Sequence, residues 1–524
     1  NGRFACRVDV EGGVIDPFNY GREAQTFIPG ASSGCEPLNI FGEGVASAAA
    51  LDFINVDLTN KVQLTQHVVN GYLSGDFGAL FELPGGPVGF AFGGEYRKEE
   101  SKFNPDQIST RTVAGEPDTG LLQDLALLGP ESGSFDVVEG FAELNVPLLA
   151  DLPFADRLEF GAAIRISDYS TIGTTTSWSV NGTYAPLQDV TFRGSYSKAV
   201  RAPNITEQFA PTQGAFSFLS DPCSPVNIDN GTEFREANCR ALLTGLGVDF
   251  GEFDFDSSSE ASTSVPGLSA GNQELTEEEA RTWTAGVIVQ PSFLRGFSLS
   301  FDWYDIRLEQ AINTASLQQL TEFCVDSATI DNVFCNNITR DQTTGYVTSY
   351  LLQPQNVAFF ETAGADITAS YRFSPGNLGT FAVTGTVGYL DKLLFLPANG
   401  GIVDNDRGEA GAPKWVGTGD VTWRKGNLLL NYGLNFVGPQ RRFEYDVTAN
   451  DPDSVDPEYL YYDSVFTHDL RAEMQTGDER AAFFVGVNNF TNERPARGAS
   501  NTPVSFLGRF YYVGVTTTLA NLFN

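Results

Sequence analysis

The chain of 524 residues lacks any run of about 18 apolar residues, the length that a membrane-spanning helix needs. This absence excludes a transmembrane helix. It does not exclude a membrane location, because a closed β-barrel crosses a bilayer with short alternating strands. The chain also lacks a GxSxG elbow, an HExxH pair and a Gly-rich phosphate loop, so we expect no enzymatic activity.

Histidine, methionine and basic residues are scarce. Two His and one Met argue against haem as a cargo, because haem iron takes axial ligands from such side chains. No cofactor is indicated. The 32 basic residues are outnumbered by 66 acidic ones, and the formal net charge of −34 disfavours nucleic acid as a partner. A solvated acidic surface is the simplest interpretation. A calcium site at Asp404, Asp406 and Glu409 is a weaker hypothesis, since the full calcium-loop spacing is absent.

The six cysteines fall into three close pairs, none with the CxxC spacing of a zinc or redox site. Each pair lies in a polar, aperiodic segment, which favours disulfides within loops in an oxidising compartment. The predicted pairs are Cys6 with Cys35, Cys223 with Cys239, and Cys324 with Cys335.

Period-two alternation, typical of β-strands with two unlike faces, recurs from about residue 60 to the end. One stretch has an apolar set (Leu158, Phe160, Ala162, Ile164, Ile166) and a second set between them (Glu159, Gly161, Ala163, Arg165, Ser167). Alternation predicts that one group of residues faces lipid (Phe160, Ile164, Val287, Leu430, Leu434, Val513). It predicts that a charged group faces the interior (Glu95, Arg97, Arg165, Arg193, Asp420).

Short and long links alternate between successive strands. Tight turns are predicted at four places (Pro84–Pro87, Leu187–Asp189, Arg424–Asn427, Thr476–Glu479) and long polar links at five (102–133, 206–275, 312–354, 396–412, 444–460). Short turns at one rim and long loops at the other are typical of an outer-membrane barrel. We therefore predict an all-β, transmembrane antiparallel β-barrel of about fifteen strands over residues 61–524, with short periplasmic turns and long extracellular loops. Residues 1–60, with Cys6 and Cys35, are predicted to form an extracellular loop region.

Several stretches resemble the TonB-dependent receptor family of outer-membrane transporters. The most specific is Phe192–Phe209 (FRGSYSKAVRAPNITEQF), in which a strand leads into Arg201, Ala202, Pro203 and Asn204. Others are Gly34–Gly42, Gly93–Arg97, Val485–Glu493 and Gly508–Gly514. The resemblance implies a plugged barrel of about 22 strands, of which these strands would be the last two-thirds. The plug and the TonB box of the family precede the barrel, and neither is recognisable in this sequence.

The Arg201–Asn204 motif also has a local physical interpretation. Pro203 fixes φ and ends strand pairing, while Asn204 can turn the chain by bonding to its own backbone. A strand-to-loop terminator is therefore favoured over a ligand site. Arg201 is expected to pair with a carboxylate on the interior wall.

Two functions remain open. The first is TonB-dependent import of a nutrient across the outer membrane, and an uncharged or cationic organic nutrient such as an oligosaccharide is favoured over a ferric siderophore, because acidic loops repel anions. Aromatic residues of the loops are the candidate ligand-binding set (Phe216, Phe218, Phe253, Tyr346, Tyr350, Tyr461, Tyr462), although loop packing also explains each of them. The second is a passive pore, or a surface scaffold that binds another protein. Expected partners are outer-membrane lipid and lipopolysaccharide, the TonB complex through the N-terminal part, a small nutrient, and a surface lipoprotein or other protein.

Overall fold

A computed structural model describes residues 36–55, 57–110, 112–113, 116–120, 129–396, 401, 403–443, 455–477, 480–495 and 504–517. The chain divides into two units. The first contains residues 1–62 and 103–128, and the second contains residues 63–102 and 129–524.

The first unit contains one helix and one small hairpin among its described residues. Helix α2 (Ala48–Ile54) begins at Ser47, whose hydroxyl accepts a hydrogen bond from the Ala50 backbone N–H. Strands β3 (Thr112–Val113) and β4 (Glu116–Gly120) pair antiparallel. The Asp106 carboxylate accepts a hydrogen bond from the backbone N–H of Thr59, and its own N–H donates to Asn60, which ties the two segments of this unit together.

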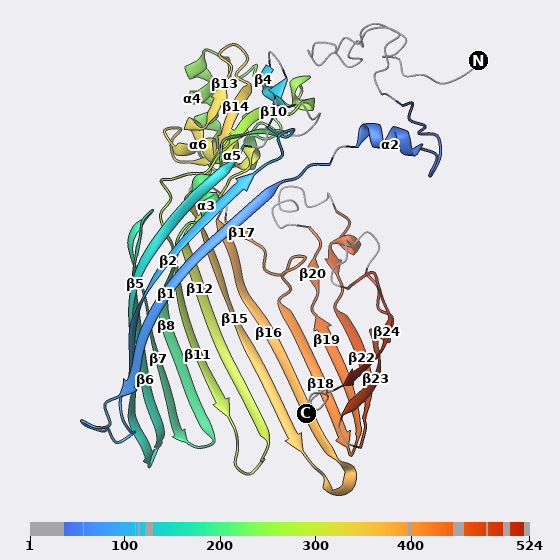
Figure 1. Cartoon of the computed structure of the whole chain (residues 1–524). Coiled ribbons are helices and arrows are strands. Elements are labelled where there is room, and N and C mark those ends of the chain that lie inside the picture. Colours follow the sequence, from blue (N-terminus) through green and yellow to red (C-terminus); the bar gives the residue numbers. More distant parts are fainter. Residues whose placement is uncertain are drawn as a thin grey trace. The chain divides into compact units, whose positions relative to one another are not determined.

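The second unit is built on one large sheet whose strands lie side by side in chain order (Figure 1). Its fifteen long strands are β1 (Lys61–Asp76), β2 (Gly89–Asn104), β5 (Glu131–Leu152), β6 (Ala155–Tyr169), β7 (Gly173–Leu187), β8 (Val190–Arg201), β11 (Glu278–Val289), β12 (Phe297–Asn313), β15 (Gln355–Phe373), β16 (Thr380–Leu396), β18 (Trp415–Lys425), β19 (Leu428–Val437), β22 (Val465–Gln475), β23 (Ala481–Asn488) and β24 (Phe510–Thr517). The short β17 (Asp404–Asn405) also pairs with β16. From β5 to β24 each strand pairs antiparallel with the next. The prediction of about fifteen antiparallel strands is confirmed.

Links at the two ends of the sheet differ in length, as predicted, with one exception. At the turn end the shortest links are 153–154, 188–189 and 426–427, and at the loop end the longest are 202–277 and 314–354. Gly426 permits the turn at 426–427 because its φ of 57° lies in the left-handed region. The exception is the link between β6 and β7 at the loop end, which contains only residues 170–172. These two strands stay paired as far as Tyr169 opposite Gly173, so a short turn is enough to connect them.

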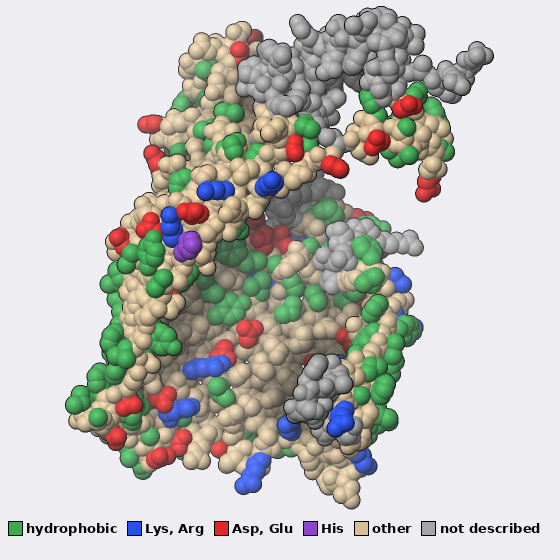
Figure 2. Space-filling model, in the orientation of Figure 1, with side chains coloured by type: hydrophobic (Ala, Val, Ile, Leu, Met, Phe, Trp, Pro, Cys, Tyr) green, Lys and Arg blue, Asp and Glu red, His purple; other side chains and the backbone are tan. Residues whose placement is uncertain are grey.

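The strand register gives the sheet two unlike faces. Arg193 lies opposite Gly286, which lies opposite Asp302, and Arg165 lies opposite Phe141. We call the face that carries these groups the charged face, and Figure 2 shows acidic and basic side chains on the hollowed side of the sheet. The opposite, apolar face exposes Phe160, Ile164, Leu430 and Val513. The alternation predicted from the sequence is therefore present.

Two loop-end links combine into a compact body, which we call the loop module (residues 202–277 and 314–354). Its sheet has the order β13 (Ile338–Arg340), β14 (Val347–Leu352), β10 (Val265–Ser269), β9 (Gln213–Ser217). Its helices are α3 (Ile205–Phe209), α4 (Arg235–Leu246), α5 (Leu317–Asp326) and α6 (Val333–Asn336). The module has its own apolar core, which includes Leu243, Phe255 and Val325.

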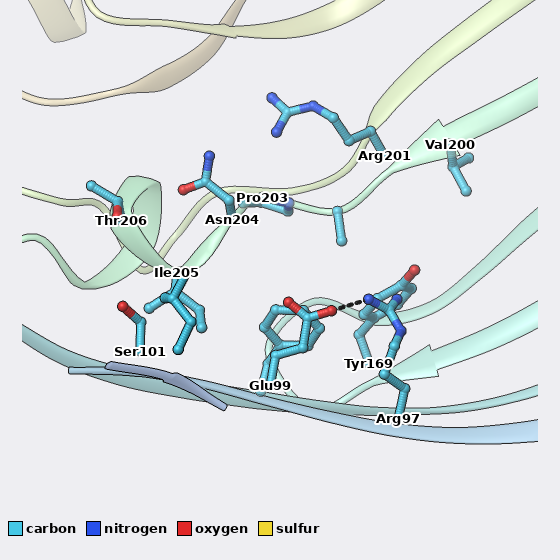
Figure 3. Close-up of a pocket in the computed structure, with 13 residues that line it drawn as sticks. Arg97, Glu99, Ser101, Tyr169, Val200, Arg201, Pro203, Asn204, Ile205 and Thr206 are labelled. Atoms are coloured by element: carbon cyan, nitrogen blue, oxygen red, sulfur yellow. Dashed lines mark hydrogen bonds and ion pairs between the residues drawn. The ribbon is translucent and has the colours of Figure 1, made fainter. Parts of the chain in front are cut away.

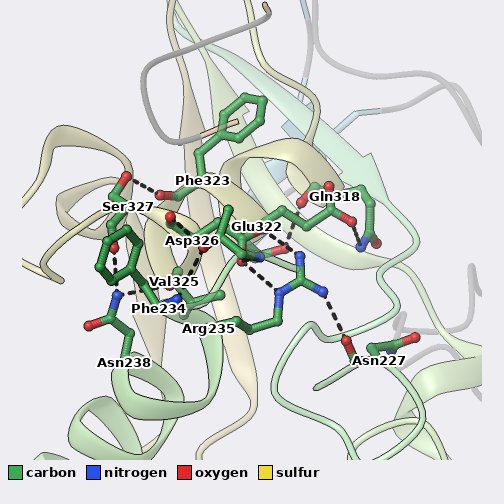
Figure 4. A network of polar contacts seen from close by, with 12 residues as sticks. Asn227, Phe234, Arg235, Asn238, Gln318, Glu322, Phe323, Val325, Asp326 and Ser327 are labelled. Atoms are coloured by element: carbon green, nitrogen blue, oxygen red, sulfur yellow. Dashed lines mark hydrogen bonds and ion pairs between the residues drawn. The ribbon is translucent and has the colours of Figure 1, made fainter. Parts of the chain in front are cut away.

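Two buried ion pairs lie inside the loop module. The Arg235 guanidinium donates to both oxygens of Asp326 at 2.8 and 2.5 Å, and both side chains are almost fully buried (Figure 4). Arg340 donates to both oxygens of Asp221 in the same way, at 2.6 and 3.2 Å. Each pair joins one link to the other, so the two links fold as one body.

The remaining elements are short. They are the hairpin of β20 (Gln440–Arg441) with β21 (Tyr461–Tyr462), and the 3-10 helices η1 (Ile228–Asn230), η2 (Glu260–Ser262), η3 (Gly376–Leu378) and η4 (Pro457–Tyr459). None of the helices in the described part of the chain combines the length and hydropathy needed to cross a bilayer.

Candidate functional site

The Arg201–Asn204 motif ends β8 and starts α3. Asn204 is the N-cap of α3, because its side chain accepts the Glu207 backbone N–H at 2.8 Å while Glu207 accepts the Asn204 N–H at 2.8 Å. This reciprocal arrangement is a capping box. Pro203 is fully buried and, having no N–H, cannot continue the strand ladder. The interpretation of the motif as a strand terminator is thus borne out by its geometry.

Two carboxylates hold the Arg201 side chain. Its Nε donates to Glu278 on β11 at 2.5 Å, and its terminal nitrogens donate to Glu207 at 3.0 and 3.1 Å. Glu278 is buried and also accepts the Ile312 backbone N–H. The expected carboxylate partner on the wall is therefore Glu278. Glu207 could have been found from its position three residues after Asn204, whereas Glu278 is 77 residues from Arg201 and gives no local signal.

Helix α3 folds back over β5. Ile205 and Phe209 pack where Gly133 has no side chain, since a Cβ there would lie 2.6 Å from Ile205 and 2.7 Å from Phe209. The Thr206 hydroxyl donates to Glu131 at 3.1 Å. Gly133 thus allows the segment after the motif to lie against the charged face.

This fold-back borders the candidate site, an open cavity of about 540 Å³ between the motif and strands β1, β2, β5 and β6 (Figure 3). Its polar lining includes Arg97, Glu99, Tyr169, Arg201 and Asn204. The Arg97 guanidinium forms an ion pair with Glu99 and lies 5.8 Å from the centre of the Phe135 ring. Hydroxyl, amide and charged groups beside an aromatic ring suit a small polar organic ligand.

Predicted interior residues are paired on the charged face. Arg193 donates to both oxygens of Asp302 at 2.7 and 2.6 Å across the intervening strand β11. This reach is available because Gly286 lies between them, where a Cβ would be 2.1 Å from the Asp302 oxygen. Arg165 lies 3.6 Å from Glu139.

The remaining three predicted interior residues have similar partners. Glu95 lies 3.8 Å from Arg97 on the same strand, and Asp420 accepts from Asn431 at 3.5 Å. Of the five predicted residues, only Arg97 lines the cavity beneath the motif. The others are spread along the wall.

The aromatic candidates for ligand binding do not form one site. Phe253 and Tyr350 lie in the core of the loop module at 4% and 2% exposure, so a ligand cannot reach them in this arrangement. Tyr346 packs on Phe253 and Phe255 with ring centres 5.8 and 5.1 Å apart. Phe253 and Tyr350 belong to this core, and Tyr346 packs against it, because the module is large enough to bury its own apolar side chains. The exposed candidates are Phe216, Phe218 and Tyr461, while Tyr462 is half-buried against Arg442.

Two of the three predicted disulfides, Cys223–Cys239 and Cys324–Cys335, are present with Cα–Cα distances of 5.4 and 4.6 Å. Cys6 and Cys35 lie outside the described residues, and their pairing stays a prediction for mass mapping without reduction. The described residues contain no group of three or more His, Cys, Asp or Glu placed to hold a metal. The calcium site at Asp404, Asp406 and Glu409 stays a hypothesis.

The loop module is strongly acidic. Residues 202–277 and 314–354 contain sixteen acidic and three basic side chains, a formal charge of −13. Backbone N–H groups of Thr344 and Thr343 donate to Asp341 and hold the pKa of its carboxyl below the usual value. The Glu260 carboxyl also has a lowered pKa, chiefly from its own backbone N–H and then from the Ser259 hydroxyl. These two groups keep their charge at neutral pH.

An all-antiparallel meander with an apolar outer face, a charged inner face and long loops at one end defines the class of outer-membrane barrels. The family model described as "TonB dependent receptor-like, beta-barrel" matches residues 18–490. The chain belongs to this family of TonB-dependent receptor barrels, which are proteins of the outer membrane.

Solved structures of the same fold include the ferric enterobactin receptor PfeA of Pseudomonas aeruginosa in complex with enterobactin (13% identity, TM-score 0.54, 87% of this chain and 54% of that chain). Others are the siderophore receptor PirA of Acinetobacter baumannii (16%, 0.53, 87% and 55%) and the FrpB iron transporter of Neisseria meningitidis (12%, 0.51, 87% and 55%). The chain spans little more than half the length of these structures. No curated protein matches it.

Proposed function

We propose that the protein imports a nutrient across the outer membrane with energy supplied through TonB. The observation that carries this proposal is family membership over residues 18–490, and a sheet with a charged hollow face supports it. The polar side chains of that face would contact a plug, which the family places in the barrel. The plug and the TonB box would come from the same polypeptide, because the matched structures are nearly twice as long as the matched region.

Further strands are needed to close the barrel. In the strand order of the described residues, β1 and β24 lie at opposite ends and do not pair with each other. An open edge in hydrocarbon costs several kcal/mol for each unsatisfied backbone group. We expect strands of the same polypeptide to pair with both edges.

The apolar face would contact lipid. A row of paired charged residues near the loop end would mark where this lipid-facing surface ends. Lys198, Arg281 and Arg307 lie opposite one another on three neighbouring strands near the loop end of this face. Lys198 pairs with Glu279, and Arg307 pairs with Glu309 at 3.0 Å. Such a row fits the level of lipopolysaccharide headgroups better than hydrocarbon, where charge is costly.

For the substrate, we propose an uncharged or cationic organic nutrient. The loop module, with its charge of −13, would repel anions and attract cations. PfeA is described as a ferric enterobactin receptor and PirA as a siderophore receptor, but at 13% and 16% identity their likeness concerns the fold. The cavity beneath Arg201 is lined by both basic and acidic side chains, which can donate and accept hydrogen bonds.

Uptake measurements in cells test both the proposed TonB-dependent import and the proposed substrate class. A deletion strain complemented with the full-length gene should take up the labelled nutrient only when TonB is intact. Uptake that continues without TonB would instead support the passive pore, and binding without any uptake would support the scaffold. In the same strains, growth under iron limitation on a ferric siderophore should not depend on this gene. Dependence would overturn the proposed substrate class.

A further inference from the structure

Strand β9 forms an open edge of the loop module. It pairs with β10 along its whole length, from Gln213 opposite Ser269 to Ser217 opposite Val265. No described residue pairs with its other side. Edge strands are usually protected by charges, proline or a bulge. The β9 sequence, QGAFS, contains no charge and no proline, and its register with β10 is regular.

Side chains of β9 divide between the core and the surface. The Ser217 hydroxyl bonds to the Tyr350 hydroxyl at 3.0 Å, so this side faces the core. Phe216 and Phe218 point the other way and are 66% and 70% exposed. Leu268 on the neighbouring β10 adds to the same apolar surface. Exposed aromatic rings beside an unpaired edge commonly mark an interaction site.

The charge of the loop module indicates which kind of partner would bind at the open edge of β9. All three arginines of the module form ion pairs with carboxylates of the module itself. The pairs are Arg235–Asp326, Arg340–Asp221 and Arg240–Glu236. The unpaired charge of the surface is therefore acidic, with exposed residues that include Glu252 and Glu260. Asp256 lies near the segment that follows β9, because it accepts from the Ser220 hydroxyl at 2.9 Å.

We propose that β9 binds a free, extended, basic peptide as an added strand. Backbone groups of the peptide would hydrogen-bond to the open edge of β9, which gives affinity without sequence preference. Alternate apolar side chains of the peptide would cover Phe216 and Phe218. Its lysines or arginines would lie over the acidic surface and accelerate the encounter.

Peptide binding tests this surface separately from import. The probe is a fluorescein-labelled decapeptide of alternating lysine and valine, added to the full-length protein in detergent and followed by fluorescence anisotropy. The double substitution Phe216→Ser with Phe218→Ser should weaken binding by about ten-fold or more, as expected for loss of aromatic anchors. The matched control is Phe293→Ser, an exposed ring in a turn at the opposite end of the sheet. It should bind as the unchanged protein does.

Two altered peptides identify the binding mode. A decapeptide of alternating glutamate and valine should bind far more weakly, and raised salt should weaken binding of the lysine peptide. N-methylation of alternate backbone amides should abolish binding, since it removes strand pairing. The proposal is overturned if the lysine peptide does not bind, if the double variant binds equally well, or if the glutamate or N-methylated peptide binds as tightly. Intact disulfides in the variants would exclude misfolding of the module. Loss of binding with uptake preserved would leave the proposed import standing.

Discussion

In the large sheet Phe160, Leu430 and Val513 are exposed on one face, whereas in the loop module Phe255 and Val325 are fully buried. The same kinds of side chain thus take opposite positions within one unit of the chain. The sheet keeps its charges on the hollow side and its apolar groups outside. The module keeps apolar groups inside and most of its charges outside, as a domain in water does.

The difference follows from the solvent of each region. A sheet in lipid gains nothing from an apolar interior, and its backbone ladders satisfy the polar groups that lipid cannot. The module must instead exclude water from a core, and it adds two disulfides and two buried ion pairs to do so. The module should therefore be destabilised by substitutions that the sheet tolerates, and the sheet by substitutions that the module tolerates.

The largest expected effect is on the module, at its buried ion pair. Arg235→Met leaves the Asp326 carboxylate buried without its cation, which typically costs about 3–5 kcal/mol. The matched control is Arg240→Met on the same helix, whose exposed pair with Glu236 contributes about 0–1 kcal/mol. Limited proteolysis should cut residues 202–277 in the first variant while the sheet keeps its heat-modifiable migration in gels. Equal protease resistance of the two variants would contradict the buried-core account.

The second effect is on the sheet, at adjacent residues of β19. Leu430 lies on the apolar face, and Asn431 lies on the charged face, where it bonds to Thr422 and Asp420. Leu430→Arg places a charge toward lipid at a cost of up to about 2–4 kcal/mol near the midplane and should reduce assembly. Asn431→Arg, at the same depth, should assemble. Equal amounts of the two variants in the outer membrane would show that the faces are assigned wrongly.

The sequence predicted the sheet better than the module. Alternation of residues such as Phe160 and Arg165 is a local signal with a period of two, and each strand pairs with its neighbour in the chain. The module depends on contacts between two links, such as Arg235 with Asp326, that are 91 residues apart. No local pattern reports such a contact.

The aromatic residues illustrate the same limit. Phe253 and Tyr350 lie in polar segments, which suggested accessible rings, yet the two links bring them together in a core. In contrast, the cysteine pairs Cys223–Cys239 and Cys324–Cys335 were predictable because each closes a short segment. The cavity beneath Arg201 was not predicted. Its lining joins residues from β2, β6 and β8 that only the curvature of the sheet and the fold-back of α3 bring close.

The smallest expected effect concerns the charged face at Gly286. Gly286→Ala puts a methyl group where the Arg193–Asp302 pair crosses β11, so Asp302 must turn away from Arg193. The pair is partly exposed, and its loss should cost only about 0.5–1 kcal/mol, seen as a small decrease in the thermal unfolding temperature in detergent. Gly433→Ala on the same face is the control, since its new methyl would meet its neighbours at 3.5 Å or more. If the ion pair is the cause, Gly286→Ala should add little in an Asp302→Asn background. Full additivity of the two substitutions would mean that the glycine is required by the backbone itself, where the Phe301 carbonyl lies 2.9 Å from the added carbon.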